Sequence, residues 1–366
     1  MNHSEILEIA KQFETASFPI AAKPYGEGLI NFTFEIQTQK GTRYVLQEIN
    51  TYVFRNPRGV MSNIQGITDF LSNQIQKAGG DPSRETLRLI PTKSGEIFYV
   101  HPKDQSYWRM YDFIANATAY QSAEKEGLLF EAARAFGDFQ RKLSDYPAHT
   151  LCEVIPAFHD TAARYAAFEE AMNKDAAGRA DGVREEIEFL RGKESWAHLI
   201  VDALREGRIP TRVTHNDTKL NNVLIDDETE KGICVIDLDT VMPGALLYDF
   251  GDSVRFAANN GAEDDRDLSR VWIRTELYEE YVAGFLKGVG DSITEEELRM
   301  LPESVVVLTY ELALRFMTDY LNGDLYFKVQ SEDHNLVRTR AQIKLMSDTI
   351  AKLDTLHAIT EKYAMN

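Results

Sequence analysis

The sequence predicts an α+β protein of two unequal lobes, a small antiparallel sheet lobe followed by a larger, mainly helical lobe. The chain has 366 residues, which is too long for one ordinary small core. Residues that alternate between apolar and polar dominate the first third, whereas from about residue 125 the apolar residues recur every three or four positions. We therefore expect a lobe of residues 1–115, a lobe of residues 116–366, and a ligand-binding cleft between them.

The first lobe contains the predicted sheet. The runs "INFTFEIQT" and "RYVLQEIN" alternate on either side of a short polar stretch in which Gly41 allows a turn, so they predict an antiparallel hairpin. Residues 60–77 carry apolar side chains at helical spacing and predict one helix. The runs "EIFYVH" and "YWRMYDFI", joined by a polar linker, predict two more strands.

The second lobe is expected to be helical, with a pair of short strands near residues 212–236. Five segments show an apolar stripe at three- and four-residue steps. These predicted helices span residues 128–144, 185–207, 271–289, 305–322 and 337–359.

Composition excludes several classes of function. A net charge of −18 argues against sequence-independent binding to nucleic acid or to an anionic membrane. The two cysteines form no zinc or disulfide pattern, and Cys234 lies in an apolar run as a buried thiol. The acidic amphipathic start has no apolar signal-peptide core, and no stretch approaches a membrane span of roughly 18 apolar residues. We expect a cytoplasmic enzyme or binding protein.

The run "THNDTKLNN" and the following "VIDLD" carry the chemistry. Phosphoryl transfer needs a carboxylate to accept the proton of the attacking hydroxyl, and oxygen ligands for a metal that bridges nucleotide phosphates. His215, Asp217, Lys219 and Asn222 follow one predicted strand, and Asp237 follows another. A solvated turn rich in Asp and Asn is the alternative interpretation, but the apolar strands, the second acidic motif and the upstream sheet disfavour it.

This arrangement resembles the catalytic core shared by protein kinases and aminoglycoside phosphotransferase-type small-molecule kinases. The resemblance implies a two-lobed, protein-kinase-like fold that uses ATP and Mg²⁺. It makes Asp217 the general base, lets Lys219 steady the transferred phosphoryl group, and assigns Asn222 and Asp237 to the metal. His215, and Asp249 in "YDFGD", are expected to fix the loop instead.

The nucleotide side rests on the first lobe. Gly26 and Gly28 in "YGEGLINFTF" let backbone amides approach phosphates, and the resemblance adds Asn31. Gln47 stands where kinases carry the phosphate-gripping lysine, and the helix at 60–77 has no Glu to pair with such a lysine. By fold analogy, adenine contacts the connector between the lobes, formed by Phe113, Ile114 and Ala115.

A finer resemblance, to the N-acetylhexosamine 1-kinases, extends over nearly the whole chain. It includes "WRMYDFI", "FHDTAARY", "VIDLDTVMPGALLYDFGDSVRF" and "LRFMTDYLNGDLYF". It implies phosphorylation of the anomeric hydroxyl of N-acetylglucosamine or N-acetylgalactosamine, with Arg315, Tyr326 and Asp217 contacting the sugar. Leu29 departs from the family pattern, which has a sugar-contacting His there, so epimer and N-acyl preference stay open.

Other functions remain possible from the residues alone. Arg315 shares a helix face with Glu311 and Asp319, so a structural ion pair competes with sugar binding. The acceptor could be an aminoglycoside, choline or an unacetylated hexose, or the chain could bind nucleotide or sugar without catalysis. We expect small-molecule partners, with neither nucleic acid nor membrane, and the sequence predicts no oligomeric state.

Overall fold

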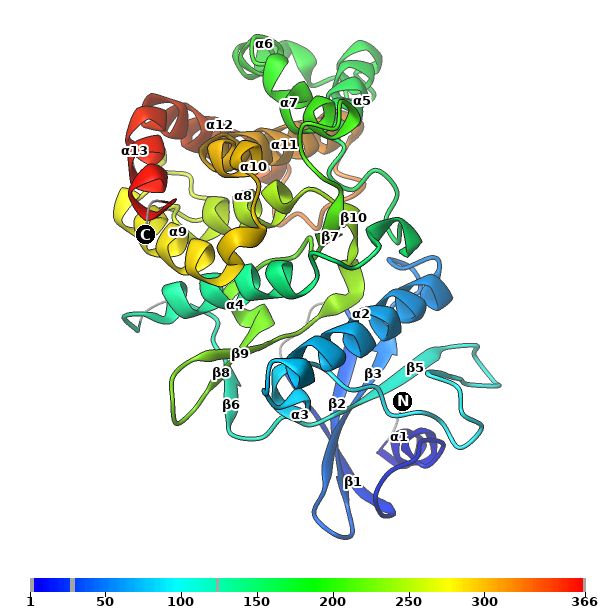
Figure 1. Cartoon of the computed structure of the whole chain (residues 1–366). Helices are drawn as coiled ribbons and strands as arrows, with labels where there is room; N and C mark the ends of the chain where they lie inside the picture. Colours follow the sequence, from blue (N-terminus) through cyan, green and yellow to red (C-terminus); the bar gives the residue numbers. More distant parts are fainter. Residues whose placement is uncertain (1–2, 27–29, 123–124, 365–366) are drawn as a thin grey trace. The chain divides into compact units, whose positions relative to one another are not determined.

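The computed structural model describes residues 3–26, 30–122 and 125–364, whose helices and strands form two units (Figure 1). The sheet unit contains a small antiparallel sheet and the helical unit contains most of the helices, so the predicted fold class is confirmed. The sheet unit comprises Met1–Ala119, Asp145–Pro156 and Val223–Pro243. The helical unit comprises Tyr120–Ser144, Ala157–Asn222 and Gly244–Asn366. The lobe boundary expected after residue 115 stays a prediction.

Five antiparallel strands build the main sheet in the order β1-β2-β3-β5-β4. Their bounds are β1 Pro19–Pro24, β2 Phe32–Thr38, β3 Arg43–Ile49, β4 Tyr99–Val100 and β5 Tyr107–Asp112. The predicted hairpin is β2–β3, in which Phe34 pairs with Leu46 and Gly41 takes a positive φ of 84° in the turn. β4 is shorter than expected.

Two helices flank this sheet. Helix α1 (His3–Ala10) places Ile6 and Ile9 in the same apolar cluster as Leu46 and Trp108 of the strands. Helix α2 (Pro57–Lys77) begins where the Asn56 side chain accepts a hydrogen bond from a backbone N–H in the first turn. The predicted helix at 60–77 is therefore confirmed with one extra turn.

The side chain of Asn63, in α2, explains why segments 145–156 and 223–243 belong to the sheet unit. Its Nδ2 donates to the carbonyl groups of Cys152 (2.8 Å) and Val241 (2.9 Å). The sheet unit also contains a smaller sheet with the strand order β6-β8-β9. Its strands are β6 Ala117–Ala119, β8 Val223–Asp226 and β9 Gly232–Val235. The other short elements are the one-turn helix α3 Pro82–Glu85 and strand β10 Met242–Gly244.

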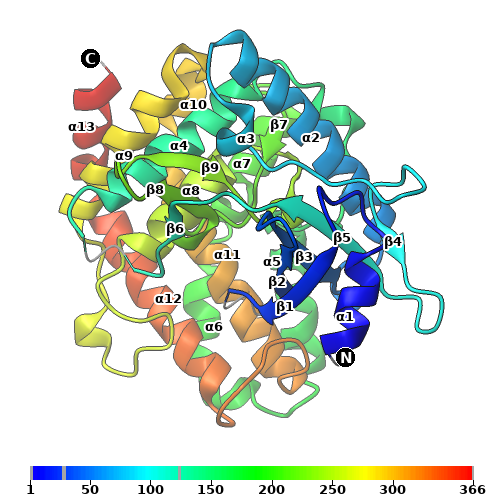
Figure 2. The same ribbon diagram turned by 90° about the horizontal axis from the view of Figure 1, so that it is seen from below.

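The helical unit packs its helices around α11. Helix α11 is apolar on nearly all sides, and two clusters of buried side chains contain residues from it. Figure 2 shows it running beside α12. The elements are α4 Leu128–Lys142, α5 Thr161–Lys174, α6 Arg184–Arg191, α7 Ser195–Arg205, β7 Arg212–Thr214, α8 Leu246–Ala257, α9 Thr275–Val289, α10 Glu295–Arg299, α11 Leu301–Asn322, α12 His334–Ala351 and α13 Leu353–Ala364.

Two of the segments predicted as single helices each form two helices in the structure. The segment 185–207 breaks between α6 and α7, where Gly192 caps α6 and the polar Lys193 follows. The segment 337–359 breaks at Lys352, between α12 and α13. In both segments the apolar spacing continues across the break, which is why periodicity alone missed it.

Across the described ranges, which omit 1–2, 27–29, 123–124 and 365–366, no helix is long and apolar enough to cross a membrane.

Candidate active site

One buried carboxylate fixes the loop between β7 and β8, which carries the predicted catalytic residues. Asp249, in α8, accepts hydrogen bonds from the backbone N–H groups of His215 (2.9 Å) and Asn216 (2.7 Å). Its third donor is Nε2 of Gln140 in α4, at 2.7 Å. Burial raises the pKa of Asp249, while the neighbouring His215 and these donors oppose the rise. The loop-fixing role expected of Asp249 agrees with these contacts.

His215 supports the loop from the protein interior. Its fully buried ring packs edge-on against Phe136 and Phe139, with centroids 5.6 and 6.0 Å away. Its Nδ1 accepts a hydrogen bond from the backbone N–H of Asp217 at 3.3 Å. The next residue, Asn216, adopts a left-handed backbone conformation (φ 63°), which Asn tolerates better than most residues. These contacts fix the backbone conformation of the residues that lead into Asp217.

The loop brings three predicted site residues together. Lys219 Nζ lies 2.5 Å from Asp217 Oδ1, in an ion pair whose side chains are 47% and 25% exposed. Asn222 Nδ2 donates to the backbone carbonyl of Asp217 at 2.7 Å and to Asp217 Oδ2 at 3.2 Å. The Asp217 carboxylate is therefore held in place, and its partial exposure leaves it accessible to a hydroxyl group.

Asp237 lies in the sheet unit, two residues beyond the end of β9. Its φ of 59° and ψ of 57° are left-handed, and the one-turn helix Leu238–Thr240 follows it. A side chain other than Gly held in this region costs roughly 1–3 kcal/mol, and such residues cluster at functional sites. The backbone of the loop thus fits a residue selected for function.

The sequence missed the most buried cation of the sheet unit, Arg109 in β5. Its guanidinium is 1% exposed, pairs through Nη1 with Asp239 Oδ1, and donates to Gln47 Oε1 through Nε (3.0 Å) and Nη2 (2.9 Å). Burial favours the neutral form, but attraction to Asp239 outweighs it and raises the pKa of Arg109. The one signal in the sequence was a lone charge within an apolar strand.

Two of the predicted nucleotide-binding residues, Gln47 and Asn31, join the same network. Gln47 Nε2 donates to Thr33 Oγ1 at 3.0 Å. Asn31 Nδ2 donates to Asp239 Oδ2 at 2.6 Å, and its Oδ1 accepts from the backbone N–H of Asn50. Gly26 takes a positive φ of 74°. Gly28 and Leu29 lie outside the described residues.

The expected adenine connector follows β5. The Phe113 ring lies beneath the Arg43 guanidinium at 3.8 Å and beside the Tyr25 ring. Ile114 is buried among apolar side chains. The carbonyl oxygen of Ala115 already accepts a hydrogen bond from Arg84 (2.7 Å). That carbonyl is therefore engaged within the protein, and adenine contact at these three residues stays a prediction.

The predicted acceptor residue Arg315 lies in a cluster of buried charges in the helical unit. Glu311 is fully buried, and its carboxylate lies 3.1 Å from His159 Nδ1 and 3.7 Å from Arg315 Nη1. The expected ion pair of Arg315 with Glu311 is thus present. Burial opposes ionisation of Glu311, but attraction to His159 and then Arg315 lowers its pKa. His159 was not predicted as a site residue.

Aromatic rings surround the Arg315 guanidinium. It lies 5.6 Å from the Phe158 ring, 5.9 Å from Tyr326 and 5.5 Å from Phe327. Tyr326 is 71% exposed, and its backbone N–H donates to Asp319 at 2.8 Å. The structure thus brings Arg315 and Tyr326 together, and most of the Tyr326 side chain is exposed.

Electrostatics connect the Glu311 cluster to the Asp217 loop inside the helical unit. Burial opposes ionisation of Asp252, but Arg255, then His159 and Lys219, lower its pKa. The Asp252 carboxylate is therefore influenced both by the His159 imidazole and by the ammonium group beside Asp217.

The donor types suit a hard divalent cation. Among the residues that the structure describes, no three or more His, Cys, Asp or Glu side chains gather to hold a metal ion. Magnesium at a nucleotide site needs fewer protein ligands, because phosphates and waters complete its shell. The Asn222 amide nitrogen points to Asp217, which leaves its oxygen as the donor atom. That oxygen and the carboxylate of Asp237 are each a ligand type that Mg²⁺ accepts, and their joint role as metal ligands stays a prediction.

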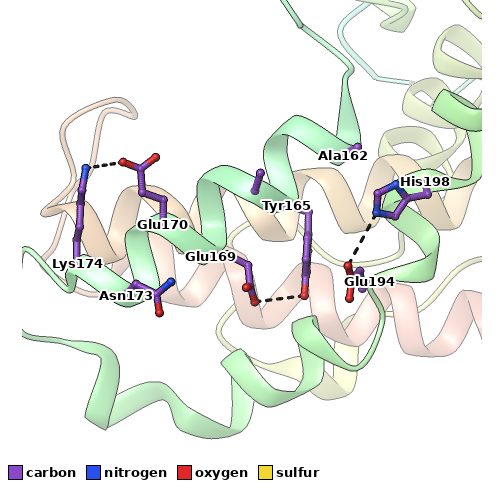
Figure 3. Close-up of a pocket in the computed structure, with 9 residues that line it drawn as sticks. Ala162, Tyr165, Glu169, Glu170, Asn173, Lys174, Glu194 and His198 are labelled. Atoms are coloured by element: carbon purple, nitrogen blue, oxygen red, sulfur yellow. Dashed lines mark hydrogen bonds and ion pairs between the residues drawn. The ribbon is translucent and has the colours of Figure 1, made fainter. Parts of the chain in front are cut away.

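An open hollow of about 710 Å³ between α5 and α7 lies outside the predicted site residues. Figure 3 shows that most of its polar side chains pair with one another. Glu169 pairs with Tyr165, Glu170 with Lys174, and Glu194 lies 4.0 Å from His198. It contains none of the predicted catalytic or acceptor residues.

Comparison with known proteins identifies the family. Residues 21–285 match the model of the phosphotransferase enzyme family. The chain belongs to this phosphotransferase family. The matched segment includes the Asp217 loop and Asp237, whereas Arg315 and Tyr326 lie beyond it. Membership therefore establishes the type of enzyme and leaves the acceptor open.

Solved structures share the phosphotransferase fold at low sequence identity. An aminoglycoside phosphotransferase from Alicyclobacillus acidocaldarius subsp. acidocaldarius is 14% identical, with a TM-score of 0.64 over 97% of this chain and 96% of that one. A spectinomycin phosphotransferase in complex with ADP and spectinomycin is 13% identical (TM-score 0.57; 97% and 99%). The amicoumacin kinase hAmiN with AMP-PNP and Ca²⁺ is 15% identical (TM-score 0.55; 99% and 94%).

Proposed function

We propose that the protein is an ATP- and Mg²⁺-dependent sugar 1-kinase that phosphorylates the anomeric hydroxyl of N-acetylhexosamines. The observation that carries the proposal is the loop that holds Asp217, Lys219 and Asn222 within hydrogen-bonding or ion-pairing distance of one another. Membership in the phosphotransferase family and the resemblance of nearly the whole chain to N-acetylhexosamine 1-kinases support it.

Asp217 acts as the general base. Asn222 holds its carboxylate and the His215 ring holds its backbone N–H, so that a carboxylate oxygen can accept the proton of the sugar hydroxyl as the new O–P bond forms and the bond from the γ-phosphorus to ADP breaks. The anomeric hydroxyl is the most acidic hydroxyl of a sugar, which makes this transfer comparatively easy. Positioned bases contribute about 10²–10⁴-fold to such reactions. Lys219, beside the carboxylate, steadies the transferred phosphoryl group.

Nucleotide and metal are bound by the remaining predicted residues. Gly26, Gly28, Asn31 and Gln47, with the connector at 113–115, are proposed to contact ATP. Asn222 and Asp237 are proposed to hold Mg²⁺, which when bound neutralises charge on the phosphates. The ADP, AMP-PNP and Ca²⁺ present in two of the related structures support a nucleotide and a divalent metal.

The cluster around Glu311, which we call the acceptor cluster, suits a neutral sugar better than an amine. It contains His159, Arg164, Glu311 and Arg315. The Glu311 carboxylate is fully buried and already paired with His159 and Arg315, so a bound ammonium group would have to displace one of these partners. Guanidinium groups donate well to sugar hydroxyl and acetamide oxygens, and the exposed Tyr326 side chain can stack on a sugar face.

The test is ADP release with a panel of N-acetylhexosamines, plain hexoses, choline and aminoglycosides. We expect turnover with an N-acetylhexosamine, and a product phosphate that phosphorus NMR places on C1 and that mild acid removes. Turnover with an amine alone, or an acid-stable phosphate, would contradict the proposed acceptor. Nucleotide binding without ADP release for any acceptor would favour a catalytically silent binding module.

A further inference from the structure

The buried hydrogen-bond network around Arg109 includes Gln47, the position at which protein kinases carry the lysine that binds the phosphates. In protein kinases a lysine on the third strand pairs with a helix glutamate, and the pair must be in place for transfer. Here the corresponding position is Gln47, and α2 contains no Glu. A cation is nevertheless present one strand away, because β3 and β5 are neighbours and Gln47 pairs with Arg109 in register.

We propose that Arg109 and Asp239 replace that ion pair, and that Arg109 is a positioning residue that fixes the Asp237 loop and the Asn31 segment to the sheet. The inference rests on the proposed nucleotide and metal site. The acid of the pair comes from the loop two residues beyond the proposed metal ligand, instead of from a helix.

Every polar group at the centre of the network has a partner within the sheet unit. Arg109 donates twice to Gln47 and once to Asp239. The second oxygen of Asp239 accepts from Asn31, whose own oxygen holds the Asn50 backbone N–H. Both Asp239 oxygens are thus engaged in fixing the loop.

The geometry gives the pair a mechanical role. Asp237 occupies a left-handed backbone conformation, and the Arg109–Asp239 pair anchors the chain two residues beyond it. Asp239 is 3% exposed, and the guanidinium that pairs with it is 1% exposed, so the pair is shielded from solvent and salt. Because Arg109 is buried and committed to Gln47 and Asp239, it acts through Asp237 and Asn31 without touching the phosphates itself.

The test measures Mn²⁺–ADP binding by electron paramagnetic resonance, beside thermal unfolding, in full-length protein. Asp239→Asn and Arg109→Met are expected to weaken Mn²⁺–ADP binding by about 10–100-fold, the usual effect of removing a group that orients a metal ligand. Arg109→Lys keeps the charge and should recover part of the affinity.

A double variant separates positioning from folding. Arg109→Met with Asp239→Leu leaves no unpaired buried charge, and such apolar replacements are often neutral for stability. We expect its melting temperature to return toward wild type while Mn²⁺–ADP affinity stays at least about 10-fold low. Wild-type affinity in the double variant, or failure of the double variant to fold, would overturn the proposal in favour of a purely structural pair.

Asp348→Asn is the matched control. Asp348, in α12, also accepts from a cation, Lys352 (2.7 Å), and from the backbone N–H of Ile273 (2.9 Å). Its loss should lower stability without changing Mn²⁺–ADP affinity. Wild-type protein that binds Mn²⁺–ADP but phosphorylates no sugar would refute the proposed function and leave this inference intact, whereas wild-type protein that binds no Mn²⁺–ADP would refute both.

Discussion

Asp217→Asn separates catalysis from folding in this loop. The substitution removes the base but keeps the shape of the side chain, and the amide oxygen can still accept from Asn222. The ion pair with Lys219 is lost, but at 47% and 25% exposure such a pair contributes at most about 1 kcal/mol. The hydrogen bonds that Asp249 accepts from the loop backbone are unaffected.

The expected effect on turnover is much larger than the effect on stability. Loss of a positioned base lowers kcat by about 10²–10⁴-fold, which corresponds to roughly 2.7–5.5 kcal/mol of activation free energy. The assay is the initial rate of ADP release at saturating ATP and N-acetylhexosamine, with thermal unfolding of the same samples. The melting temperature should fall by no more than about 4 °C.

Asp227→Asn is the control for this experiment. Asp227 is an exposed carboxylate just beyond β8 that accepts a hydrogen bond from Thr118 Oγ1 at 2.7 Å, so it resembles Asp217 in type but lies outside the proposed site. Its kcat should match wild type. A folded Asp217→Asn protein whose kcat stays within about threefold of wild type would refute the assignment of the base.

Three further predictions concern the scaffold and the acceptor cluster. Asp249→Asn cannot accept all three N–H donors, so urea unfolding should show a loss of about 1–3 kcal/mol, with lower kcat; unchanged stability would contradict the loop-fixing role. Glu311→Gln should cost about 3 kcal/mol at neutral pH, because it leaves His159 and Arg315 without their partner. The pKa of Glu311 is lowered from 4.5, so its stabilising charge is present above pH 4.5 and lost as the pH falls through the folded value; the deficit in unfolding free energy should shrink below about pH 5, and a pH-independent deficit would exclude the charge as its cause. Arg315→Ala should raise the KM for sugar about 10-fold or more with an unchanged KM for ATP, and equal changes in both would argue against acceptor binding.

Local patterns predicted much of the fold. The β2–β3 hairpin and α2 follow from alternation, a glycine turn and helical spacing, all of which act within a few residues. The break between α6 and α7 was missed because Ile187 and Leu190 keep the spacing that Ala197 continues. The cap at Gly192, which ends α6, separates the two helices without interrupting that spacing.

The sequence predicted those site residues that lie close together along the chain, and it missed those whose partners are far apart in the sequence. Asp217, Lys219 and Asn222 lie within six residues, and the structure places them in contact. Arg109 and Asp239 are 130 residues apart, and alternation in β5 cannot tell a charge that faces solvent from one that is buried against another loop. The partner of such a charge can be found only once the strands and loops are placed.

Bulk charge and local pairing bear differently on the proposed acceptor. A net charge of −18 permits a polycationic substrate, because an acidic surface attracts cations over long distances. Surface charge is screened within about 10 Å at ordinary salt, whereas buried charges act at contact distance on whatever binds beside them. At the acceptor cluster the Glu311 carboxylate is fully buried and already paired with His159 and Arg315. A bound ammonium group would have to displace one of these partners, whereas a hydroxyl or acetamide oxygen can accept from the Arg315 guanidinium while the pair stays in place, which is why the proposed acceptor is an N-acetylated sugar.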